Sequence, residues 1–95
     1  MRYLHANTDR RVSEWELADV ARVDAGTLRR HFRARFDRTP TAYHRDVRLE
    51  KAAVMLLNRG LVLRTSEEAG FESLSGFVEA FRKRYGVSPG KYAGA

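Results

Sequence analysis

Arginine is concentrated in one stretch of this 95-residue chain, residues 25–38, which carries a net charge of +4 out of +6 for the whole sequence. On a helix, with about 100° of rotation per residue, Arg29, Arg30 and Arg33 would point away from the apolar side of this stretch. A guanidinium group donates two parallel hydrogen bonds to O6 and N7 of guanine, and it also pairs with phosphate. The stretch therefore predicts a helix that enters the major groove of DNA.

Gly26 lies on the same outward side, where the lack of a side chain would let the helix backbone come close to DNA. The alternative is a solvated arginine surface, held by pairs of opposite charge three or four residues apart. Residues 25–36 contain no carboxylate that could form such pairs within the helix. DNA contact is the favoured interpretation.

A twelve-residue pattern occurs twice in the chain, 49 positions apart. Residues 32–43 and 81–92 both read F-R-x-R-[FY]-x-x-[ST]-P-x-x-Y. Each copy begins as an arginine-rich helix end and then restarts a helix at a hydroxyl cap followed by proline. The repeat predicts two similar helical units.

The helix of the second copy has a much less basic outward side, with Ser75, Glu79 and Arg82 outward and Leu74 and Val78 at the margin. Leu74 and Val78 could contact thymine methyl groups or could extend the core, and both interpretations stay open. Glu79 could accept a hydrogen bond from N4 of cytosine, but a carboxylate is repelled by phosphates. We therefore expect the first unit to dominate the affinity for DNA.

Glycine and proline fall between segments with helical periodicity, and no stretch alternates apolar and polar residues for long enough to predict a strand. The expected helices span about residues 1–7, 13–21, 25–37, 40–58, 62–69, 73–85 and 89–92. This order predicts one all-α domain with two helix-turn-helix units, residues 1–38 and 60–95, joined by a linker helix within residues 39–59. At 1.5 Å per residue, the linker helix would be about 28 Å long.

Local patterns indicate how these helices begin and what they bury. Ser13 and Glu16 fit a capping box, in which each side chain accepts a hydrogen bond from the other residue's amide. The expected inner face of the following helix is Trp15, Leu17, Ala18 and Ala21. The expected inner face of the linker helix is Tyr43, Val47, Ala52, Leu56 and Leu57.

Polar and basic residues near the two hydroxyl-proline caps are candidates for phosphate contact, because helix N-termini and nearby cations commonly bind phosphate. They are Arg38, Thr39, Arg82, Lys83, Arg84 and Lys91. These residues would position the protein on DNA and contribute little to sequence specificity.

Several classes of function lack a signal. The chain has no cysteine, and its three histidines lie on different expected helices without metal-binding spacing, so we expect no metal, no cofactor and no enzymatic activity. No apolar stretch is long enough to span a membrane, and a soluble cytoplasmic protein is expected. A helical module that contacts RNA polymerase or a partner regulator remains the alternative function.

Three groups of residues follow one another along the chain. The first is Leu17-Ala18, Asp24 and Leu28-Arg-Arg-x-Phe32; the second is Thr39-Pro-x-x-Tyr43, Val47-Arg48-Leu49, Ala52 and Leu56-Leu57; the third is Gly70-Phe71, Ser73, Phe77, Phe81, Tyr85-Gly-Val-Ser-Pro89 and Tyr92. Together they resemble the DNA-binding domain of AraC/XylS-family transcriptional regulators over essentially the whole chain. The third group is the most diagnostic.

The resemblance implies a monomeric domain that places two recognition helices in successive major grooves of double-stranded DNA, and it allows a contact with RNA polymerase. By position, it implies base-reading roles for Gly26, Thr27, Arg29, Arg30 and Arg33 in the first unit. In the second unit it implies the same role for Leu74, Ser75, Val78 and Glu79.

Two departures from the family pattern concern stability. Thr65-Ser66 stands where the family usually has an apolar residue and alanine, so isoleucine at a buried Thr65 is expected to raise stability. Asp37 stands where glycine is common, which is tolerable because aspartate can adopt the left-handed conformation.

Overall fold

The computed structural model describes residues 2–94, which form seven α-helices and contain no strand. The helices are α1 (Arg2–Ala6), α2 (Glu14–Ala21), α3 (Ala25–Phe36), α4 (Pro40–Leu57), α5 (Val62–Glu68), α6 (Leu74–Tyr85) and α7 (Pro89–Gly94). The all-α prediction and the order of the helices are confirmed. Met1, expected in the first helix, lies outside the described residues.

Side-chain caps explain where four helices begin. The side chains of Ser13, Asp24, Thr39 and Ser73 each accept a hydrogen bond from the amide three residues further on. Each satisfies one of the amides that a helix leaves without a partner in its first turn. The junctions predicted from these residue types are confirmed.

The prediction of a capping box at Ser13 and Glu16 is only half correct. Ser13 accepts from the amide of Glu16 at 3.0 Å, but the Glu16 carboxylate turns to Arg10, at 2.8 Å from Nη1, and accepts the hydroxyl of Tyr3. Hydrogen bonds from Arg10 and then Tyr3 lower the pKa of Glu16 to about 2. The charged guanidinium of Arg10 outcompetes the backbone amide for this carboxylate. The hydrogen bond from Tyr3, on α1, to Glu16, on α2, joins the two helices.

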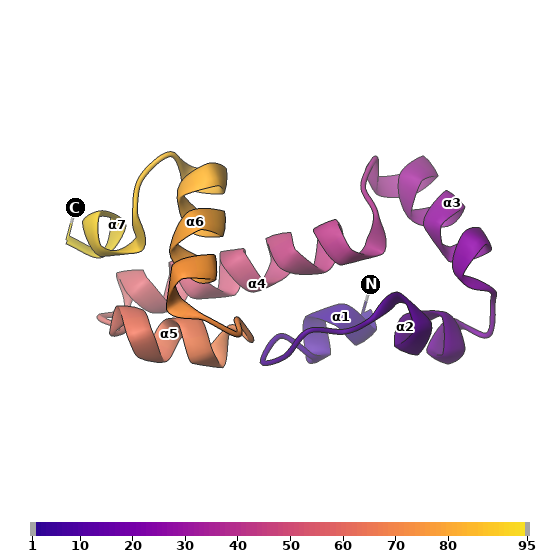
Figure 1. The fold of residues 1–95 in the computed structure, drawn as a ribbon, viewed down its shortest axis with the longest axis horizontal. Helices are drawn as coiled ribbons and strands as arrows, with labels where there is room; N and C mark the ends of the chain where they lie inside the picture. Colours follow the sequence, from indigo (N-terminus) through magenta and orange to yellow (C-terminus); the bar gives the residue numbers. More distant parts are fainter. Residues whose placement is uncertain (1, 95) are drawn as a thin grey trace.

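The central helix α4 is the long axis of a molecule with extents of 43 × 21 × 20 Å. In Figure 1, α1, α2 and α3 gather around one end of α4, and α5, α6 and α7 gather around the other. The two groups also meet through their loops. A Cβ atom on Gly70 would lie 2.6 Å from the backbone nitrogen of Arg10, so only glycine fits this approach.

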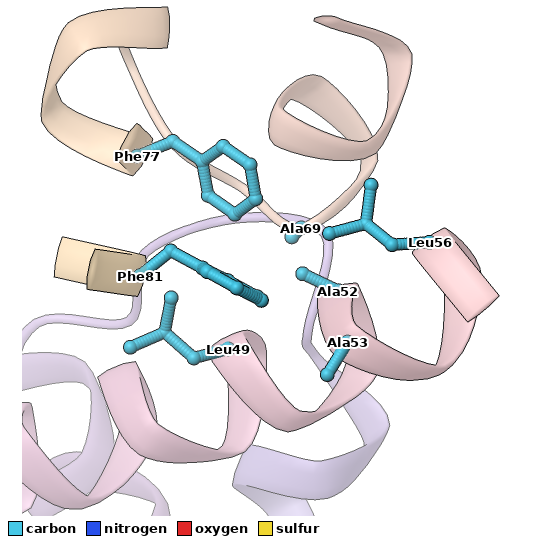
Figure 2. Close-up of a cluster of buried hydrophobic side chains, with 7 residues drawn as sticks. All are labelled: Leu49, Ala52, Ala53, Leu56, Ala69, Phe77 and Phe81. Atoms are coloured by element: carbon cyan, nitrogen blue, oxygen red, sulfur yellow. The ribbon is translucent and has the colours of Figure 1, made fainter. Parts of the chain in front are cut away.

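Each end of α4 has its own hydrophobic cluster. Leu4, Val12, Leu17, Ala18, Leu28 and Phe32 form the first cluster. Leu49, Ala52, Ala53, Leu56, Ala69, Phe77 and Phe81 form the second. Figure 2 shows the rings of Phe77 and Phe81 packed over the aliphatic side chains of α4. The small alanines of α4 leave room for these two rings.

Three residues predicted to face inward are exposed. Trp15 is 80% exposed, because the buried side of the short helix α2 is centred on Leu17 and Ala18 and Trp15 lies well away from that direction. Ala21 is the last residue of α2, where it borders an open hollow. Leu57 is 62% exposed, since it is rotated by about 100° from the buried Leu56.

Thr65 of α5 is fully buried, and its hydroxyl has no hydrogen-bond partner among the described residues 2–94. A buried hydroxyl without a partner costs about 1–3 kcal/mol. We expect Thr65→Val to raise the free energy of unfolding by about 1 kcal/mol, and Thr65→Ile to raise it less, because the extra methyl group must fit beside Gly60. Thermal unfolding measures the effect, and an unchanged or lower melting temperature for both variants would contradict it.

Candidate nucleic-acid interface

The arginine-rich helix α3 is anchored by aromatic packing on α4. Leu28 and Phe32 are each 3% exposed. The ring of Tyr43, on α4, lies 5.5 Å from the ring of Phe32 and 4.5 Å from that of Phe36. These contacts fix the rotation of α3 about its axis, and the rotation decides which side chains face solvent.

The opposite side of α3 carries the predicted base-reading arginines. Arg29, Arg30 and Arg33 are exposed and, with Ala34 and Thr39, border a shallow open hollow. The predicted outward orientation is confirmed. Cations grouped on one exposed helix face create the local positive potential that attracts a polyanion.

Arg29 has a carboxylate neighbour that the sequence did not reveal. No acidic residue of α3 pairs with it, but Glu14 of α2 lies 3.7 Å from its guanidinium. The absence of a carboxylate partner within α3 is confirmed, but the neighbouring helix supplies one for Arg29. Because the Arg29 side chain is exposed, a phosphate can compete for it at low energetic cost.

Arg30 is held by a chain of hydrogen bonds from the start of α3. Its Nη2 donates to the hydroxyl of Thr27 at 3.1 Å, and that hydroxyl donates to the carboxylate of Asp24 at 3.0 Å. The amide of Thr27 also donates to Asp24, at 2.8 Å. These two bonds from Thr27 are the main reason that the pKa of Asp24 is lowered.

Gly26 lies beside this chain. A Cβ atom there would lie 3.2 Å from Oδ1 of Asp24 and 3.6 Å from Nη1 of Arg30. The first distance is tight and the second is an ordinary contact. An added Cβ atom would thus crowd the carboxylate of Asp24 but only touch the guanidinium of Arg30. The close approach of the backbone to DNA at Gly26 stays a prediction.

We expect Thr27→Val to keep the helix cap, since the amide remains, and to release the guanidinium of Arg30. Loss of one hydrogen bond, about 0.5–1.5 kcal/mol, should reduce discrimination at the base read by Arg30 about two- to twelvefold. Thr27→Ser should restore it. Binding to duplexes that differ at one base pair measures the effect, and a further loss when Thr27→Val is added to Arg30→Ala would show that Thr27 acts on its own.

The second candidate reading helix, α6, is anchored by Phe77 and Phe81, which are both fully buried. Ser75 and Glu79 are exposed, Leu74 is 42% exposed and Val78 is partly buried. Within residues 2–94, the second hydrophobic cluster and the partly buried side chains packed against it include neither Leu74 nor Val78. This face is available to a ligand but offers no cation among its four predicted base-reading residues.

The residues predicted to contact phosphate differ in whether their side chains already have partners in the protein. Arg38 pairs with Asp46 at 3.0 Å, and Arg84 pairs with Glu50 at 3.1 Å. The hydroxyl of Thr39 is used as the cap of α4. Arg82, Lys83 and Lys91 are exposed and have no ion pair within residues 2–94.

The sequence analysis missed the position of Arg48, which is 4% exposed on α4. Its Nη1 donates to the carbonyl of Gly70 at 2.8 Å, and its guanidinium lies 4.6 Å from the ring centre of Phe71. Spacing could have indicated this burial, because Arg48 lies four residues before Ala52 on the inner side of α4. Arg48 fixes the loop before α6 onto α4.

Among residues 2–94, no group of three or more histidine, aspartate or glutamate side chains is placed to hold a metal ion. Within the same range, no helix combines the length and apolar character needed to cross a membrane.

The fold and the exposed faces of α3 and α6 define a domain with two helix-turn-helix units. A family model described as a helix-turn-helix domain matches residues 17–95. The chain belongs to the AraC-type helix-turn-helix family of transcriptional regulators.

Curated relatives are longer than this chain. It is 36% identical over 87 residues to the HTH-type transcriptional regulator CdhR of Pseudomonas aeruginosa, covering 90% of this chain and 26% of that protein. It is 32% identical over 88 residues to the regulator MtrA of Neisseria gonorrhoeae, covering 88% and 29%. The chain thus spans between a quarter and a third of the length of these two relatives.

Solved structures share the fold. The DNA-binding domain of AdpA, a global transcriptional factor solved in complex with a target DNA, superposes with a TM-score of 0.92 at 22% identity over 98% of this chain and 85% of that one. An AraC-type regulator from Chromobacterium violaceum gives the same TM-score at 21% identity, over 98% and 84%. At these identities the similarity establishes the fold.

Proposed function

We propose that this chain binds double-stranded DNA with sequence specificity, as the DNA-binding domain of a bacterial cytoplasmic transcriptional regulator. Helices α3 and α6 would lie in successive major grooves on one side of the duplex. The observation that carries the proposal is the exposed face of α3, with Arg29, Arg30 and Arg33 directed to solvent. We propose no enzymatic activity for it.

The dimensions of the molecule support two contacts on one side of DNA. Successive major grooves are about 34 Å apart along the duplex. The molecule is 43 Å long, and α3 and α6 lie toward opposite ends of α4. The structure of AdpA bound to its target DNA, which has the same fold, adds support by analogy.

The base-reading residues that we propose are Gly26, Thr27, Arg29, Arg30 and Arg33 on α3, and Leu74, Ser75, Val78 and Glu79 on α6. The phosphate contacts that we propose are Arg38, Thr39, Arg82, Lys83, Arg84 and Lys91. The exposed cations of these sets supply affinity, and the polar groups at the start of α3 supply most of the specificity.

A second candidate function is contact with RNA polymerase or a partner regulator. Val54, Leu57 and Leu61 are 60%, 62% and 72% exposed, at the end of α4 and in the following loop. Large apolar side chains that are exposed to solvent favour a protein partner. This contact is compatible with DNA binding because it uses a different part of the surface.

Fluorescence anisotropy with a labelled duplex, measured from about 50 to 200 mM salt, tests DNA binding directly. If Z phosphates are neutralised, the logarithm of the association constant falls against the logarithm of salt with a slope of about −0.9Z. We expect the domain to bind as a monomer, and the association constant to fall steeply as the salt concentration rises. Absence of binding at low salt would refute the proposal and favour the protein-interaction function.

A further inference from the structure

A hollow of about 350 Å³ lies where the two units meet. Its lining includes Arg11 from the loop after α1, Arg45 and Arg48 of α4, and Lys83 of α6. Two carboxylates, those of Glu72 and Glu79, also line it. Cations from three separate segments therefore converge on one open space.

The carboxylates do not neutralise these cations. Arg11 pairs with Glu72 at 3.4 Å, and both side chains are well exposed. Arg45, Arg48 and Lys83 form no ion pair within residues 2–94. Four cations and two carboxylates leave the lining with a net positive charge.

The buried guanidinium of Arg48 lacks one of its hydrogen-bond acceptors in the described part of the chain. Within residues 2–94, its Nε is buried without an acceptor, although its Nη1 is bonded to Gly70. Burial, and then repulsion from Arg11 and Arg45, lowers the pKa of Arg48 to about 10. A buried cation beside like charges is stabilised by an anion, so the chemistry of the hollow favours a negatively charged ligand.

The hollow lies between the two candidate reading faces. Glu79 belongs both to its lining and to the outward face of α6. On the other side, Thr41 of the lining lies two residues after Thr39, which borders the arginine hollow of α3. A duplex with α3 and α6 in successive major grooves would present the phosphates of the intervening minor groove to this region.

We propose that the hollow binds a phosphate group of the DNA backbone between the two stretches of major groove, an inference that rests on the proposed function. Arg45, which is exposed, and Lys83 contact the phosphate by charge-assisted hydrogen bonds. Arg48 is a positioning residue that holds the loop before α6 against α4 and adds its positive charge to the lining. This contact sets the spacing and relative register of the two recognition helices.

The test combines Arg45→Gln with DNA whose central phosphates are replaced, one at a time, by uncharged methylphosphonates. The matched control is Arg64→Gln, which removes the same charge from an exposed residue of α5 that does not line the hollow. The duplex is the one recovered by selection with the wild-type domain. Unfolding midpoints of both variants confirm that they are folded.

We expect one central methylphosphonate to weaken binding of the wild-type domain and of Arg64→Gln about tenfold. The same substitution should have almost no further effect on Arg45→Gln. Arg45→Gln should also reduce the magnitude of the slope of the logarithm of the association constant against the logarithm of salt by about 0.9, for every DNA sequence. Equal losses for all three proteins at every central phosphate would overturn the proposal, even if sequence-specific binding itself is observed.

A second arm separates DNA from a free anion. Melting temperatures are measured with inorganic phosphate and with chloride at equal ionic strength, without DNA. If phosphate stabilises the wild-type domain but not Arg45→Gln, and the methylphosphonates show no coupling, the hollow is a site for a free anion and the DNA assignment is overturned. Failure to select any duplex refutes the proposed function separately, and the assignment falls with it.

Discussion

Arg30→Ala should reduce discrimination at one or two base pairs of the target site. A bidentate contact between arginine and guanine contributes about 1–3 kcal/mol of discrimination, a factor of about 5–150. Arg30 is exposed, and its guanidinium is oriented by Thr27, so little order is lost when it binds a base. The measurement is competition between duplexes that carry single base-pair changes.

Arg35 provides the matched control because it lies on the same helix and is also exposed, but its guanidinium lies toward the ring of Phe36, 5.7 Å from the ring centre. Arg35→Ala should weaken all duplexes by a similar small factor. Lys83→Ala should also weaken all sequences alike, as expected for a phosphate contact. An equal loss on specific and random duplexes for Arg30→Ala would refute its base-reading role.

Phe81→Ala should remove a large part of the stability of the second unit. Phe81 is fully buried, and its ring lies 4.6 Å from that of Tyr85 and 5.2 Å from that of Tyr92. Truncation of a buried phenylalanine costs about 3–5 kcal/mol, whereas domains of this size are stable by only about 5–15 kcal/mol. Urea unfolding followed by circular dichroism should show a much lower midpoint.

The control is Leu57→Ala, at a residue that is 62% exposed on the adjoining helix α4. It should change the free energy of unfolding by no more than about 0.5 kcal/mol. Because Phe81 anchors α6, Phe81→Ala should also weaken DNA binding, although it changes no charge. A midpoint close to that of the wild type would contradict the packing described in Figure 2.

The helices could be predicted from the sequence because their boundaries depend on local chemistry. Ser13, Asp24 and Thr39 cap helices in the structure as their residue types indicate, and Asp37 ends α3 in the left-handed conformation with φ of 53°. These features involve residues that are close in sequence. Helical periodicity likewise placed Arg29, Arg30 and Arg33 of α3 on the outward side.

Contacts between distant segments could not be predicted in the same way. The partner of Glu16 is Arg10 rather than its own helix, and the partner of Arg29 is Glu14 of another helix. Trp15 has the residue type of a core position, but it is exposed because no element covers that side of α2. The burial of Arg48 depends on a loop that lies more than twenty residues away in the sequence.

The most direct test of sequence-specific DNA binding is selection of bound duplexes from a random pool at near-physiological salt, followed by sequencing. The domain described here should enrich two blocks about one helical turn apart, the stronger one opposite Arg29 and Arg30. A single block would show that α6 does not read bases. Binding without any enrichment, or no binding at all, would contradict the account.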